Sequence, residues 1–126
     1  MLVPDFIKWA ESMQVEENRI MLLKGEEYTV SDEDKFKNFK SIGERTNVSA
    51  LKVAMIYFLK HVDSIRNYEQ HGTEASDEEI EGRIMDARNY LLLMGGIIHE
   101  EKMEKKKRLM GDFDKVVETF DGEILR

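Results

Sequence analysis

Polar residues at helical spacing are the part of this sequence that could carry out chemistry. Glu79, Arg83, Asp86 and Tyr90 recur every three or four positions near the middle of the chain. At about 100° per residue, these four side chains fall within one narrow stripe of a helix. The stripe borders an apolar face, with Asn89 at its edge. Polar groups beside a buried face need partners, so this stripe is a candidate site.

A second polar stripe occurs earlier in the chain. Lys60 and Asp63 are three residues apart, and His61 falls close to the apolar positions of the same segment. The loop expected between the two segments is short, which favours antiparallel packing and brings the stripes together. The sequence therefore predicts one polar pocket, whose members are Lys60, His61, Asp63, Arg83, Asp86 and Asn89.

The functional interpretation of this pocket is phosphate chemistry. Asp63, Glu79 and Asp86 are the predicted catalytic residues and the predicted ligands of Mg²⁺, a hard cation that prefers carboxylate oxygen. Lys60 and Arg83 would then hold phosphate oxygens. The predicted ligand-binding residues are Lys60, His61, Arg83, Asn89, Tyr90, Glu26 and Asn38.

A purely structural interpretation competes with this one. Arg83 with Asp86, and Lys60 with Asp63, are spaced to form ion pairs within one helix. A single His at the edge of an apolar stripe is more often a hydrogen-bonded core residue than a catalytic base. The three His residues have no metal-ligand spacing, and no Ser-His-Asp order or glycine-rich phosphate loop is present.

The least regular segment, residues 26–47, is the expected place for a binding loop. Glu26 and Asn38 could close over a ligand there. The alternative is a capped connector in which Phe36 and Phe39 fill the core. For the two Phe residues the core role is favoured, and for Asn38 both interpretations stay open.

The elements that must position these residues are all helical. Ser49 is the expected N-cap of the Lys60 helix, and Ser76 with Glu79 forms a capping box before the Asp86 helix. Gly25 is the expected C-cap of the first helix, and Gly95-Gly96 could kink or end a later helix or let another helix approach closely. The predicted helices are residues 4–24, a short helix ending at Gly43, 49–69, 77–94 and 97–120, with possible breaks at Gly95-Gly96 and Gly111-Asp112. The predicted fold is an all-α bundle of four to five helices.

Composition sets the broader expectations. The chain has 126 residues, which predicts one domain, with apolar residues on more than one helix face that favour a homo-oligomer. It has no Cys, no run long enough for a membrane span and no signal-peptide pattern at its start, so the expected location is the cytoplasm. The net charge of −7 disfavours nucleic acid as a partner, although Lys105 to Arg108 form a basic run.

Three stretches together carry a family resemblance: residues 24–28 (KGEEY), 60–65 (KHVDSI) and 79–93 (EIEGRIMDARNYLLL). They resemble a family of small helical proteins common in bacteriophages and prophages. That family is similar to the nucleotide-modification-associated domain and, more remotely, to the MazG-like all-α nucleoside-triphosphate pyrophosphohydrolases. The resemblance covers about residues 20–98 and leaves a C-terminal helical extension from residue 99 outside it.

The resemblance implies a cytoplasmic, oligomeric protein that acts on or near nucleotides. In the MazG-like enzymes, acidic clusters on two neighbouring helices bind Mg²⁺ and a triphosphate and release pyrophosphate. Asp86 matches the closing acid of the second cluster, but Arg83 stands where an earlier acid is expected. Glu16 and Glu17 lie in the first helix, where Ile20 replaces the next acid. These departures leave binding without hydrolysis open.

Two functional hypotheses follow. The first is a phage-type nucleotide-binding protein, with Mg²⁺-dependent nucleotide pyrophosphohydrolysis as its enzymatic form. The second is a non-enzymatic phage protein that binds a host protein or sequesters a nucleotide. A third hypothesis, a DNA-binding protein, is the least favoured because the net charge is acidic.

Overall fold

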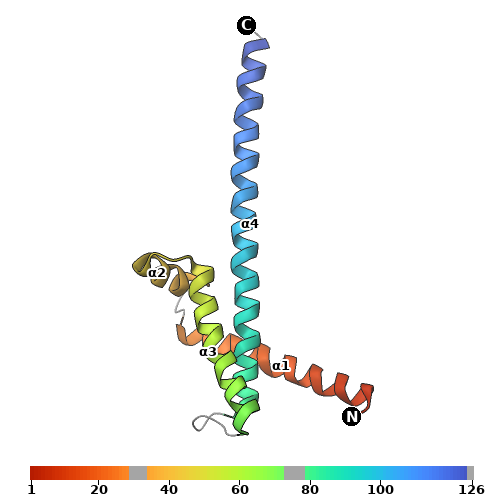
Figure 1. The fold of residues 1–126 in the computed structure, drawn as a ribbon. Helices are drawn as coiled ribbons and strands as arrows, with labels where there is room; N and C mark the ends of the chain where they lie inside the picture. Colours follow the sequence, from red (N-terminus) through yellow and green to blue (C-terminus); the bar gives the residue numbers. More distant parts are fainter. Residues whose placement is uncertain (29–33, 73–78, 125–126) are drawn as a thin grey trace. The chain divides into compact units, whose positions relative to one another are not determined.

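The computed structural model describes residues 1–28, 34–72 and 79–124, with side chains described for 1–23, 34–72 and 79–119. This part of the chain contains four helices and no strand, which confirms the all-α prediction. The helices are α1 (Val3–Tyr28), α2 (Lys37–Thr46), α3 (Ala50–His71) and α4 (Ile80–Ile124) (Figure 1). The chain divides into two compact units, Met1–Met94 and Gly95–Arg126.

Both ends of α3 are set by local sequence. The Ser49 side chain accepts a hydrogen bond from the backbone N–H of Lys52 at 3.0 Å, which confirms the predicted N-cap. The helix ends at Gly72, whose left-handed backbone (φ 64°) lets its N–H donate to the Tyr68 carbonyl at 2.7 Å. The other predicted cap, Ser76, lies outside the described residues.

Glycines do not divide the long helices, so those predicted boundaries are wrong. α1 continues through Gly25 to Tyr28, and α4 runs without a break through Gly95, Gly96 and Gly111 over 45 residues. A glycine in a helix interior costs only about 1 kcal/mol relative to alanine. Favourable neighbouring residues outweigh that cost, so a glycine alone does not end a helix.

Gly43 was expected to end the second helix, and that boundary is also wrong. α2 continues to Thr46 and ends at Asn47, which adopts the left-handed conformation (φ 58°). Gly43 is buried, and a Cβ atom there would lie 2.6 Å from the Val48 carbonyl oxygen. Gly43 therefore lets the chain turn tightly from α2 into α3.

The core of the first unit lies between α3 and the beginning of α4. Its buried residues are Val53 and Ala54 of α3 with Ile80, Ala87 and Met94 of α4. The two helices run antiparallel, as predicted, because Tyr57 and His61 contact Tyr90 and Asp86 in reverse order (Figure 1). 

The apolar side of α4 is buried only in part. Ile84 and Leu91 are 43% and 53% exposed. The buried residues Ile80, Ala87 and Met94 recur every seven positions, so one narrow line of α4 is covered within this unit.

α1 joins this unit through a charged contact. The Nε atom of Arg88 in α4 lies 3.1 Å from Oε1 of Glu17.

Across the described helices, none combines the length and apolar character that crossing a bilayer requires. The second unit consists of the remainder of α4, and every described side chain from residue 101 to 119 is exposed.

Candidate functional site

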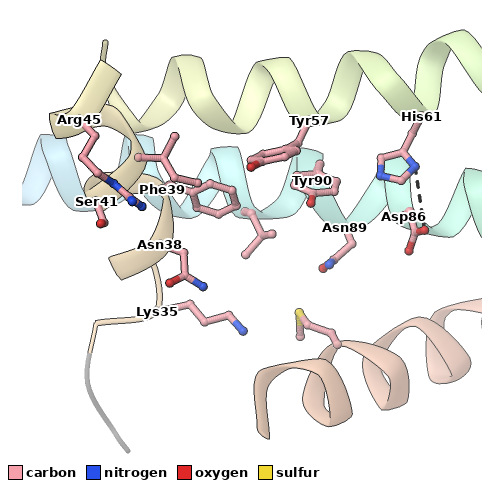
Figure 2. Close-up of a pocket in the computed structure, with 13 residues that line it drawn as sticks. Lys35, Asn38, Phe39, Ser41, Arg45, Tyr57, His61, Asp86, Asn89 and Tyr90 are labelled. Carbon is pink, nitrogen blue, oxygen red and sulfur yellow. Dashed lines mark ion pairs between the residues drawn. The ribbon is translucent and has the colours of Figure 1, made fainter. Parts of the chain in front are cut away.

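A cavity of about 500 Å³ lies within the first unit. Its walls come mainly from α2, α3 and α4, with one residue of α1 (Figure 2). The lining residues are Met21, Lys35, Asn38, Phe39, Ser41, Ile42, Arg45, Tyr57, His61, Asp86, Asn89, Tyr90 and Leu93.

Aromatic rings from three helices form the middle of the cavity wall. The rings of Tyr57 in α3 and Tyr90 in α4 stack with centroids 6.1 Å apart. Phe39 of α2 lies 6.3 Å from both of them (Figure 2). Phe39 therefore packs on its neighbours, as expected for a core residue, and also faces the cavity. This cluster gives the cavity an aromatic wall.

A histidine and a carboxylate lie at one end of that wall. Nδ1 of His61 is 3.9 Å from Oδ2 of Asp86, and both side chains are largely buried (Figure 2). The His61 ring also stacks on Tyr90, with centroids 5.3 Å apart. The two groups form an ion pair when the imidazole is protonated, so their attraction depends on the charge of His61.

Polar and cationic residues of α2 and the turn before it occupy the other end. Lys35, Asn38, Ser41 and Arg45 line the cavity there (Figure 2). Asn38, Ser41 and Arg45 are spaced by three and four positions, so they share one face of α2. This end therefore carries two positive charges and an amide.

Asp34 holds the turn that presents Lys35. Its carboxylate accepts hydrogen bonds from the Lys40 ammonium at 2.5 Å and from the backbone N–H of Phe36 at 2.9 Å. The Lys40 bond, followed by the Phe36 bond, lowers the pKa of the Asp34 carboxyl below its usual value. The turn is thus fixed from both sides of Lys35.

Five of the predicted site residues line the cavity. His61, Asp86, Asn89 and Tyr90 come from the predicted meeting of the two polar stripes, and Asn38 comes from α2. The structure thus joins α2 to the pocket expected between α3 and α4.

Four predicted residues do not line it. Lys60 is exposed, with Nζ 5.3 Å from the centre of the Tyr57 ring. Asp63 is 74% exposed and lies 3.8 Å from Arg66 of the same helix. Glu79 is exposed just before α4, and Arg83 is half-buried with a buried Nε atom. The side chain of Glu26 lies outside the described residues.

The predicted Mg²⁺ ligands are not assembled into one group. Among the described side chains, no three His, Asp or Glu residues lie together in a way that could hold a metal ion. Two acids of α1 have arginine partners: Glu16 pairs with Arg19 at 2.6 Å, and Glu17 pairs with Arg88. Asp63, Glu79 and Asp86 therefore do not fit a shared metal site, and Mg²⁺ binding stays a prediction.

Sequence reasoning missed several lining residues. Lys35, Ser41 and Arg45 were not among the candidates, and neither was Tyr57. A usable signal existed, because Tyr57 precedes His61 by one helical turn and Arg45 lies two turns after Asn38. The sequence pattern did not indicate that α2 packs beside α3 and α4.

No protein-family model, curated protein or solved structure matches this chain.

Proposed function

We propose that this protein binds a nucleotide in the cavity between α2, α3 and α4. The observation that carries the proposal is an aromatic wall with two lysine or arginine cations at one end and two asparagine amides along it. The cavity volume of about 500 Å³ lies within the range of roughly 300–1,000 Å³ typical of small-molecule sites.

The base is assigned to the aromatic wall. Tyr57 and Tyr90 line the cavity with their rings, and stacking of a base on an aromatic side chain contributes about 1–3 kcal/mol. Asn38 and Asn89 each carry a donor and an acceptor, so they can pair with the polar edge of a base. This combination favours a base over an aliphatic ligand.

The phosphates are assigned to the α2 end. Lys35 and Arg45 supply ammonium and guanidinium donors, and charge-assisted bonds from such groups to phosphate are stronger than neutral ones. The protein as a whole has a charge of −7, so a local pair of cations is needed to hold an anion.

Binding without hydrolysis is the form that the geometry favours. Of the three carboxylates predicted to bind Mg²⁺, Asp86 is the one that lines the cavity, and it faces His61. Asp86 lies toward the opposite end from Arg45 (Figure 2). The proposal is therefore a nucleotide-binding protein of phage type that sequesters its ligand, with Mg²⁺-dependent pyrophosphohydrolysis as the alternative outcome.

A ligand screen tests the proposal. The intact chain is unfolded thermally with nucleoside mono-, di- and triphosphates of each base, with and without Mg²⁺, and with inorganic phosphate and free nucleosides as controls. A ligand at one hundred times its dissociation constant stabilises the fold by about 2.7 kcal/mol. We expect an upward shift of several degrees for one class of nucleotide.

The same mixtures are assayed for released pyrophosphate. A shift without turnover supports sequestration, whereas metal-dependent turnover assigns the enzymatic form. If no nucleotide shifts the transition, the nucleotide proposal is wrong. The second hypothesis, a protein that binds a host partner, would then take its place, and the exposed Leu91 and Leu92 would be the first surface to test.

A further inference from the structure

The second unit presents an apolar stripe on a lone helix. Met103, Met110, Phe113 and Val117 recur at spacings of seven, three and four residues, which places them along one side of α4. Met110 and Phe113 are 56% and 62% exposed. A single helix has no core of its own and is marginal in water, so a stripe of this kind needs a covering surface.

We propose that a second copy of this chain covers the stripe in antiparallel orientation, forming a two-helix coiled coil. Charged residues of the unit occur in blocks along its length. The basic run Lys105 to Arg108 follows Glu100, Glu101 and Glu104, and a mainly acidic segment with Asp112, Asp114 and Glu118 comes after it. Antiparallel packing lays the basic run of each copy against this mainly acidic segment of the other.

One register pairs the central apolar residues and gives the flanking charges partners of opposite sign. It places Met110 opposite Phe113 of the second copy at the centre of the stripe. The flanking positions then pair Lys107 with Asp114 of the second copy, and Leu109 with Val116, each twice by symmetry. Asp114 has no cation three or four residues away in its own helix, so Lys107 of the other copy gives it a partner.

Other arrangements of the two helices place less compatible residues opposite each other. A parallel pair in register would set Lys106 against Lys106, Lys107 against Lys102, and Leu109 against Asp114 of the second copy. An antiparallel pair shifted by one heptad would bring the two Asp114 side chains together. Like charges at facing positions are destabilising, so these residues select the first register.

The inference is independent of the proposed nucleotide site, whose residues all lie before Gly95. Sedimentation velocity of the intact chain over a range of concentrations measures its self-association. We expect Lys107→Glu and Asp114→Lys each to raise the dimer dissociation constant roughly tenfold, and the double variant to restore it. Matched controls are Lys105→Glu and Asp112→Lys, which make the same charge changes on the outward side.

The apolar stripe is tested with Met110→Glu combined with Phe113→Glu. Both side chains are exposed, so the first unit keeps its fold by circular dichroism while the dimer dissociates. Nucleotide binding in this variant is measured separately and is expected to be unchanged.

Four results overturn the proposal. A wild-type chain that stays monomeric at all concentrations excludes the second copy, as does a dimer that survives the double glutamate substitution. A parallel pair reverses the sign for Lys107→Glu, because this change places Glu against Lys102 of the second copy. Packing of the stripe on the same chain makes the charge-swap effects independent of concentration.

Discussion

His61 of α3 and Asp86 of α4 face each other across the cavity wall, with Nδ1 and Oδ2 separated by 3.9 Å. Their side chains are 15% and 18% exposed, so the pair is shielded from most solvent screening. This contact links the two helices whose polar stripes were expected to meet. It lies toward the end of the proposed ligand site opposite Arg45 (Figure 2).

The Asp86→Asn variant measures the value of this contact. The amide keeps the shape of the side chain but removes its charge, so we expect a loss of about 1 kcal/mol in the free energy of unfolding near pH 6. Asp63→Asn is the control, because Asp63 is 74% exposed and should change stability by less than about 0.5 kcal/mol. Equal effects of both changes in urea unfolding would show that the His61 contact contributes nothing.

The Tyr57→Leu variant tests base stacking. Leucine keeps apolar volume in the wall but removes the ring that stacks on Tyr90. We expect nucleotide affinity to fall roughly tenfold or more, measured by calorimetric titration, because a stacked base contributes about 1–3 kcal/mol. Tyr68→Leu on the same helix is the matched control, since Tyr68 does not line the cavity. Unchanged affinity in Tyr57→Leu would remove the base from this wall.

The Arg45→Gln variant tests the phosphate assignment. Loss of one charge-assisted hydrogen bond, worth about 1.5–3 kcal/mol, should weaken nucleotide binding by roughly tenfold to one hundredfold. Arg66→Gln on α3 makes the same substitution away from the cavity and should leave affinity unchanged. The free nucleoside should bind both variants equally well. If Arg45→Gln weakens binding of the free nucleoside as much as binding of the nucleotide, the phosphate assignment is contradicted.

The Gly43→Ala variant tests the tight junction between α2 and α3. The added Cβ would lie 2.6 Å from the Val48 carbonyl oxygen, and this backbone atom cannot move without shifting the start of α3. We expect destabilisation by about 1–3 kcal/mol. Gly82→Ala in α4 is the control, because nothing lies within 4 Å of its Cβ, and it should stabilise by about 0.5–1 kcal/mol. Thermal unfolding that moves both variants in one direction would disprove this role of Gly43.

Asp34→Asn tests the turn that carries Lys35. The Lys40 ammonium and the Phe36 N–H depress the folded-state pKa of Asp34, so its contribution to stability is present above the unfolded value of about 3.9. The contribution is lost as pH falls through the depressed folded-state pKa. Wild type should therefore be more stable than Asp34→Asn at pH 7 and pH 5, and in urea unfolding the difference should shrink as the pH is lowered until Asp34 is protonated in both states. A difference that persists at that pH would point to another cause.

Local pattern alone was enough for the helical class and for α3. Apolar residues recur at helical spacing over residues 51–65, and Ser49 caps the start of the helix. Both signals act within a few positions, so their structural effect is independent of distant contacts. The same holds for the polar stripe that carries Asp86 and Asn89. Because α3 and α4 are neighbours in the chain, their antiparallel meeting could also be inferred.

Tertiary packing decided which polar residues share a cavity. Lys60, Asp63 and Asp86 are equally polar in sequence, but the rotation of α3 against α4 turns His61 inward and leaves Asp63 in solvent. A helix face spans only a few residues per turn, so a small rotation changes which of them meet.

Packing also explains why some glycines do not end a helix and why sequence analysis did not predict Lys35 and Arg45 as site residues. Gly25, Gly43 and Gly95 look alike as helix breakers, and only contacts such as Gly43 against Val48 distinguish a junction from a helix interior. Lys35 and Arg45 line the proposed site because α2 packs beside Tyr57 and Tyr90. Helical periodicity determines which side chains share a face, but the partner of that face depends on contacts between segments far apart in the chain.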